Sequence, residues 1–195
     1  MPRIIKRLAL LMSIAAAFGA DKDTAAFHPP PAARLNHRQT NAQVTIGADA
    51  YIAPDKVKTA FGKLDPYQYG ILPVLVVIQN DSDKTIRLDK LRAEYVGPNG
   101  DRVEATPAQD VRYLRGPNRP GVVPGSLGKL SSRKNPLDAW EIEGRAFAAQ
   151  MLPAGHSASG FFYFQTGLQR GSTIYLSGLT EAATGKELFY FEISL

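Results

Sequence analysis

Short strand-like segments separated by turn residues constrain the fold of this chain more than any other feature. The clearest are the alternating run 43–52, the apolar run 74–79 (VLVVIQ), and the aromatic runs 160–165 (GFFYFQ) and 188–195 (LFYFEISL). Short β-branched and aromatic runs between Gly, Pro, Asn and Asp are typical of antiparallel sheets. The pattern predicts an all-β immunoglobulin-like antiparallel β-sandwich of about seven to nine strands with one or two short helices, and a lipocalin-like barrel is the alternative.

Turn and cap residues locate further elements. Asn99-Gly100 predicts a hairpin with a type I′ turn, because both residues tolerate a positive φ. Pro54 and Gly62 suit the start and the end of a short helix over 54–61. Further strands are predicted at 86–88, 91–96, 102–105, 146–152 and 173–177, and one helical turn at 137–143.

The N-terminus has the order of a signal peptide. Three basic residues among the first seven precede the apolar run 8–18, which is too short to span a bilayer. Small side chains at Ala17 and Gly19 place the cleavage after Gly19, with the bonds after Ala17 or Ala20 as alternatives. We therefore expect 1–19 to be removed and the mature protein to be periplasmic or secreted, with no transmembrane segment.

The charge of the mature chain is close to balanced. The chain has 23 Lys and Arg against 18 Asp and Glu, and three of the basic residues leave with the signal peptide. This balance argues against a nucleic-acid partner. The sequence has no Cys, so it has neither disulfides nor a cysteine for lipid attachment.

Two segments lack strand character. Residues 20–42 contain three consecutive prolines and few apolar side chains, which predicts a flexible spacer before a β-sandwich domain at 43–195. Residues 106–145 are rich in Pro and Gly and predict a long irregular connection within that domain.

The motifs that resemble catalytic or metal sites are incomplete. The run from Gly155 to Gly160 approaches a G-x-S-x-G nucleophile elbow around Ser157, but Ser159 stands where the motif needs Gly, and the run enters a strand rather than a helix. Asp81 and Asp83 lack the rest of a calcium loop. We predict no catalytic residues, no metal and no cofactor; the alternative is a hydrolase whose site is assembled by the fold.

The connection carries a concentration of positive charge. Residues 111–137 contain no acidic side chain. Such a segment predicts contact with an anionic partner, namely an acidic protein, an envelope polymer or lipid headgroups, and the alternative is a solvated loop. The basic residues are Arg112, Arg115, Arg119, Lys129, Arg133 and Lys134.

The aromatic strands are apolar on both faces, whereas a sandwich sheet buries one. We expect one set of side chains in the core: Phe162, Phe164, Phe189, Phe191, Ile193 and Leu195. The other set then lies outside it: Phe161, Tyr163, Tyr175 and Tyr190. Either the connection covers this aromatic face with Trp140 as a plug, or a partner binds there.

Two turns carry a family resemblance. The strand 74–79 ends in Asn80-Asp81-Ser82-Asp83, and Pro153-Ala154-Gly155 precedes the aromatic strand at 160–165. Over roughly 70–195 this arrangement resembles exported bacterial immunoglobulin-like β-sandwich domains of unknown function. The resemblance implies the fold and no functional residues. Together these features predict a non-catalytic extracytoplasmic binding or assembly module of the bacterial cell envelope, which binds another envelope protein or an anionic envelope component.

Overall fold

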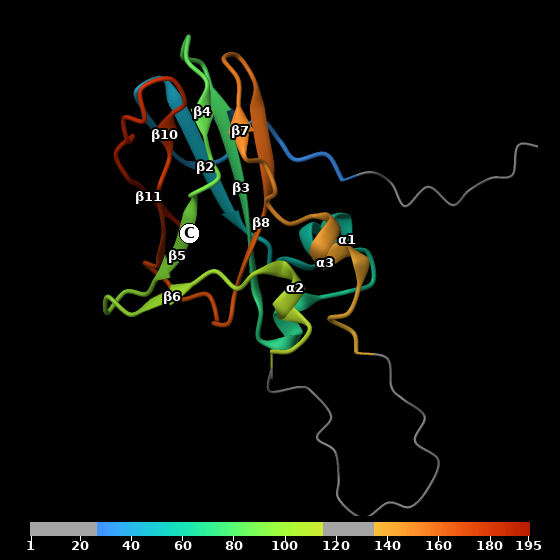
Figure 1. Ribbon diagram of the computed structural model, residues 1–195. Coiled ribbons are helices and arrows are strands. Elements are labelled where there is room, and N and C mark those ends of the chain that lie inside the picture. The colour runs from blue at the N-terminus through green and yellow to red at the C-terminus, as the bar shows by residue number, and fades with distance from the viewer. Residues whose placement is uncertain (1–26, 115–134) are drawn as a thin grey trace, which may run out of the picture.

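The computed structural model describes residues 27–114 and 135–195 (Figure 1). Within them the chain is mostly β, with eleven strands in three antiparallel sheets, three α-helices and two 3-10 helices. This confirms the all-β class. No helix among these residues is both long and apolar enough to span a membrane. The predicted signal peptide and residues 115–134 lie outside the described residues.

The strands form two four-stranded sheets and one small sheet. The first sheet has the order β1 (His37–Asn41), β2 (Val44–Ala50), β3 (Leu72–Asn80), β8 (Ser157–Phe164). The second has the order β11 (Phe191–Ser194), β9 (Thr173–Ser177), β5 (Arg92–Val96), β6 (Arg102–Glu104). The small sheet has the order β10 (Thr180–Glu181), β4 (Ile86–Arg87), β7 (Met151–Leu152).

The helices gather on one side of β3 and β8, and the second sheet lies on the other side (Figure 1). They are η1 (Ala32–Arg34), α1 (Pro54–Phe61), η2 (Pro66–Tyr69), α2 (Ala108–Val111) and α3 (Trp140–Gly144). Helix α1 has the predicted bounds, with Pro54 in its first turn and Gly62 just after its end.

Strands β3 and β8 lie between two apolar cores. Almost every side chain of β3 is therefore buried, on one face or the other. The inner core lies between the two large sheets and includes Val44, Ile46, Ala48, Leu72, Val74, Val76, Ile78, Ala93, Tyr95, Phe164, Ile174, Leu176, Phe191 and Ile193. The outer core lies between β3, β8 and the helices and includes Leu35, Tyr51, Val57, Ala60, Phe61, Ile71, Leu75, Val77, Val111, Leu137, Ile142, Phe161 and Tyr163. Burial on both faces explains the continuous apolar run of β3.

The hairpin predicted at Asn99-Gly100 joins β5 to β6, but its turn type differs from the prediction. The amide of Gly100 donates to the carbonyl of Gly97, and the amide of Gly97 donates to the carbonyl of Asp101. Gly100 has a φ of 85°, whereas Asn99 does not have a positive φ. The loop therefore needs one left-handed residue rather than the two of a type I′ turn.

A second hairpin, between β1 and β2, was not predicted. Its two turn residues, Ala42 and Gln43, have φ values of 47° and 60°. Neither residue type favours the left-handed region, so the sequence carried no turn signal there.

The prediction of a flexible spacer is wrong for the described part of 20–42. Strand β1 pairs with β2 along its whole length, and Leu35 packs in the outer core. The His37 ring Nδ1 lies 2.7 Å from the carbonyl oxygen of Ser194, and Gln39 Oε1 accepts from the Glu192 amide at 2.7 Å. All residues of β1 are polar, because it lies at the edge of its sheet, so no apolar alternation marked it as a strand.

Two predicted strands are shorter than expected. Strand β7 covers Met151–Leu152 of the predicted 146–152. Strand β11 begins at Phe191, and Phe189 is 76% exposed rather than in the core. Residues 189 and 190 both face solvent, so the alternation shifts by one position before the strand begins.

The two turns behind the family resemblance contact each other. Asn80 is fully buried, and its side-chain amide donates to the carbonyls of Lys84 (2.7 Å), Leu152 (3.1 Å) and Pro153 (3.1 Å). The Gly155 amide donates to the Asn80 carbonyl at 2.8 Å. The motif therefore joins the first sheet to the small sheet and has a structural role.

Candidate functional site

Both ends of the 106–145 connection cross the free edge of β8. At one end, the Thr106 amide donates to the Tyr163 carbonyl at 2.7 Å. At the other end, the Phe161 amide donates to the Arg145 carbonyl (2.9 Å), and the Phe147 amide donates to the Phe161 carbonyl (3.1 Å). The connection thus leaves and re-enters the inner core at neighbouring positions of one strand.

Gly160 permits one of these crossings. A Cβ atom at this position would lie 2.4 Å from the Cα of Phe147, which is closer than atoms in proteins approach. Because the chain lies directly on β8 here, Ala146 packs against the outer core while Phe147 packs against the inner core. Phe147 is therefore held where the two cores meet.

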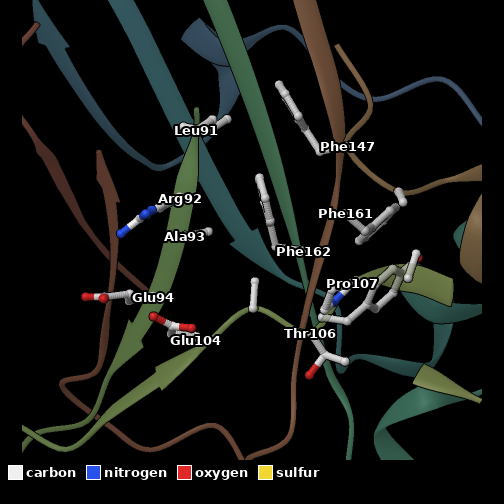
Figure 2. Close-up of a pocket in the computed structure, with 14 residues that line it drawn as sticks. Leu91, Arg92, Ala93, Glu94, Glu104, Thr106, Pro107, Phe147, Phe161 and Phe162 are labelled. Atoms are coloured by element: carbon white, nitrogen blue, oxygen red, sulfur yellow. The ribbon is translucent and has the colours of Figure 1, made fainter. Parts of the chain in front are cut away.

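A pocket of about 430 Å³ lies between the two crossings and β5; we refer to it as the edge pocket (Figure 2). Phe147 and Phe162 stack at its inner end, with ring centroids 5.4 Å apart and planes inclined by 16°. Figure 2 shows Phe162 extending from β8 toward β5. The lining residues are Leu91, Arg92, Ala93, Glu94, Glu104, Ala105, Thr106, Pro107, Ala108, Ala146, Phe147, Phe161, Phe162 and Tyr163.

The backbone of β5 forms one border of the edge pocket. Strands β5 and β6 pair from Glu94 to Val96, and the Ala105 amide still donates to the Ala93 carbonyl at 3.0 Å. The chain then leaves the sheet toward Tyr163. Among the described residues, β6 is the strand that pairs with β5 on the side of the pocket, and this pairing does not extend to Arg92 at the start of β5.

The charged groups of the edge pocket lie on the outer face of the second sheet. Arg102 forms a 2.5 Å ion pair with Glu94, and its guanidinium stacks 5.1 Å from the centre of the Tyr175 ring. Arg92 and Glu104 are exposed, and neither forms an ion pair with another described residue. The pocket therefore combines an apolar interior with a charged rim.

Tyr163 lines the edge pocket, but its hydroxyl points away from it. The hydroxyl donates to the Ile142 carbonyl at 2.8 Å inside the outer core. Burial raises the pKa of Tyr163 far above its usual value, although the nearby Arg145 charge opposes the shift. In the same core, burial and Asp49 raise the pKa of Tyr51 to about 12. Both phenols are neutral at physiological pH.

The aromatic face predicted from the sequence is divided between two places. Phe161 and Tyr163 are covered by α1, α2 and α3, so the chain itself covers this part. Trp140 is not the plug, because it is 58% exposed and stacks on the Arg145 guanidinium. The covering side chains from the connection are instead Val111, Leu137 and Ile142.

Tyr175 and Tyr190 form the uncovered part. Their rings stack with centroids 5.1 Å apart on the outer face of the second sheet, and Tyr190 is 52% exposed. The structure does not bring these tyrosines together with Phe161 and Tyr163.

The basic residues of the connection are described only in part. Arg112 forms ion pairs with Asp138 (2.7 Å) and Glu143, and its carbonyl accepts from the Asn135 side chain at 2.7 Å. These contacts hold the two described parts of the connection together. Arg115, Arg119, Lys129, Arg133 and Lys134 lie outside the described residues.

The nucleophile-elbow context fails as predicted, since Ser157 begins strand β8 rather than a turn into a helix. The neighbouring His156 ring Nδ1 lies 2.9 Å from the Ala154 carbonyl oxygen. Among the described residues there is no cluster of three or more His, Asp or Glu side chains that could hold a metal ion.

Comparison with known proteins gives no functional assignment. No family model and no characterised protein matches the sequence. One solved structure, described as the X-ray structure of Northeast Structural Genomics Consortium target SoR45, aligns with a TM-score of 0.32 and 10% sequence identity. The alignment covers 78% of this chain and 87% of that chain. At this level the similarity supports neither a fold family nor a function.

Sequence reasoning missed the edge pocket as a site. Phe147 lay in the predicted strand 146–152, and Leu91 and Ala93 lay in the predicted strand 91–96, so neither segment was marked as part of a site. The one available signal was Gly160 inside an aromatic strand, because glycine in a strand often marks the close approach of another backbone.

Proposed function

We propose that this protein is a non-catalytic binding module of the bacterial cell envelope, built on an immunoglobulin-like β-sandwich, and that the edge pocket receives its partner. The observation that carries the proposal is an apolar pocket, open between β5 and β8, with the stacked rings of Phe147 and Phe162 at its inner end. An open apolar pocket with half-buried rings and a charged rim is typical of a binding site.

The chemistry of the lining favours binding over catalysis. Most lining side chains are Phe, Leu, Ala or Pro, which cannot transfer protons or attack a substrate. The Glu94 carboxylate is paired with Arg102, and the Tyr163 hydroxyl is engaged by the Ile142 carbonyl. The polar groups present therefore suit recognition of a partner.

Site-specific photo-cross-linking in cells that make the full chain tests the proposal. A benzophenone amino acid at Glu104, on the rim, should yield a discrete adduct in the envelope fraction. The matched position is Lys58, an exposed residue of α1 on the other side of β3 and β8. Adducts at both positions, or none at Glu104, would contradict a partner at the edge pocket.

Export is tested separately. N-terminal sequencing of the mature protein should begin at Ala20 or within about three residues of it. Recovery of intact Met1 from the periplasm would contradict the envelope location.

A further inference from the structure

A second pocket, of about 510 Å³, lies at the end of the second sheet where β5 begins and β9 ends; we refer to it as the polar pocket. Four polar side chains from separate segments line it: Lys90, Arg92, Ser177 and Glu187. Figure 2 shows the Arg92 side chain extending from β5 away from Phe162, the ring at the inner end of the edge pocket. The polar pocket therefore lies on the outer side of the sheet.

The chain does not neutralise the charges of the polar pocket. Lys90, Arg92 and Glu187 are exposed, and none of them forms an ion pair with another described residue. The remaining charged residue of the lining, Asp89, is paired with Arg87 at 2.6 Å. Two unpaired cations and one unpaired anion thus share one pocket without contacting each other.

The backbone holds the two signs of charge on opposite sides of the end of β9. Gly178 has a φ of 83°, and a Cβ atom there would lie 2.1 Å from the Lys90 carbonyl oxygen, so the turn that carries Lys90 lies directly against this end. On the other side, the Leu188 amide donates to the Leu179 carbonyl at 2.8 Å, which fixes the segment that carries Glu187. A ligand that spans the pocket therefore meets backbone that is already in place.

We propose that the polar pocket binds a zwitterionic phosphoethanolamine group. The phosphate binds between Lys90 and Arg92, because ammonium and guanidinium groups form charge-assisted hydrogen bonds with phosphate oxygens. The ammonium of the ligand donates to the Glu187 carboxylate. A phosphate carries up to two negative charges, which matches two cations better than a carboxylate does. A ligand of a single sign would leave part of the pocket's charge unmatched.

The polar pocket is independent of the proposed function. It shares only Leu91 and Arg92 with the lining of the edge pocket. The variants that test it are therefore made at Lys90 and Glu187, and neither residue lines the edge pocket.

The first test uses the mature chain and soluble O-phosphoethanolamine at neutral pH and low ionic strength, followed by NMR. We expect saturable shifts at the backbone amides of Lys90, Ser177 and Glu187, with a Kd of about 1 mM. Inorganic phosphate and ethanolamine should each bind at least about fivefold more weakly, because each meets one sign of charge only. No saturable binding of phosphoethanolamine up to about 10 mM, or equal binding of inorganic phosphate, would overturn the proposal.

Two variants assign the two ends of the ligand. Glu187→Gln should bind phosphoethanolamine about fivefold more weakly and inorganic phosphate at least as tightly as the unchanged protein. Lys90→Gln should weaken the binding of both ligands. Glu192→Gln on β11 and Lys58→Gln on α1 remove exposed charges outside the pocket and should change neither affinity. Unchanged phosphoethanolamine binding in Glu187→Gln would overturn the recognition of a zwitterion.

Vesicles distinguish the two sources of this group, a lipid headgroup and a soluble compound. Vesicles that contain phosphatidylethanolamine are compared with vesicles of phosphatidylcholine, whose quaternary ammonium has no N–H donor for Glu187. Sedimentation with the first vesicles alone, lost in Glu187→Gln, identifies the headgroup and supports the site. Binding of soluble phosphoethanolamine without sedimentation supports the site with the soluble compound as its ligand. Sedimentation with both kinds of vesicle, unchanged in Glu187→Gln and Lys90→Gln, would overturn headgroup recognition by this pocket.

Discussion

The inner and outer cores share β3 and β8 but are closed by different kinds of structure. The inner core is covered by the second sheet. This sheet does not pair with β8, and the edge pocket lies between β5 and β8. The outer core is covered by helices and turns from separate parts of the chain, including both described ends of the connection. The comparison shows that the chain covers one face of β8 with its own side chains and leaves an opening beside the other.

The largest expected effect is in the outer core. Phe161 is 2% exposed and contacts the rings of Phe27, Tyr51 and Phe61. Phe161→Ala should lower the free energy of unfolding by about 3–5 kcal/mol, measured by chemical denaturation. Trp140→Ala is the control and should cost about 0.5 kcal/mol, because this ring is exposed. Equal losses would contradict the exposed position of the Trp140 ring and would show that it packs as closely as Phe161 does.

The next effect tests the hydrogen bonds that join the first sheet to the small sheet. Asn80→Ala removes the amide that donates to three carbonyls and should cost about 2–3 kcal/mol. Asn99→Ala, in the exposed β5–β6 loop, should change the midpoint of denaturation little. A loss at Asn80 below about 0.5 kcal/mol would show that the small sheet is held by other contacts.

A stabilising substitution tests the hairpin that brings β1 onto the domain. Gln43 has a φ of 60°, a region that costs non-glycine residues energy. Gln43→Gly should raise the free energy of unfolding by about 0.5–1 kcal/mol. Ala48 lies inside strand β2, where glycine is unfavourable, so Ala48→Gly should be destabilising instead. Destabilisation by both substitutions would contradict the left-handed turn.

The smallest effect concerns the buried hydroxyl between β8 and α3. Tyr163→Phe removes the hydrogen bond to Ile142 and should cost about 1 kcal/mol at neutral pH. Because burial raises the folded-state pKa of Tyr163, its contribution is fully present below the unfolded pKa of about 10 and is lost as the pH rises further. Thermal unfolding of Tyr163→Phe should therefore be less sensitive to pH above about 10 than that of the unchanged protein. Parallel profiles would contradict a buried phenol.

The contrast between the cores also explains what the sequence could predict. Alternation of period two identified most strands and the inner-core positions of Phe164, Phe191 and Ile193. The cover of the outer core depends on single residues such as Leu137, in a turn, and Ile142, in the five-residue helix α3, and neither segment is long enough to show a repeating pattern. An internal cover was anticipated, but the exposed Trp140 was the wrong residue.

The candidate site was less predictable than the fold. Tyr163 was selected as part of an aromatic face, yet its ring lines the edge pocket while its hydroxyl is in the outer core. The pocket depends on where two distant segments cross β8, and no local pattern encodes that crossing. Most of the predicted basic residues lie outside the described residues, so their role stays a prediction.

Cysteine accessibility tests the central contrast most directly, because the chain contains no Cys of its own. Single substitutions Ala105→Cys, in the edge pocket, and Ala60→Cys, in the outer core, report on the two places. The rate of thiol alkylation in the native protein should be fast at position 105 and limited by unfolding at position 60. Equally slow alkylation at both positions would contradict an open edge pocket beside a covered outer core.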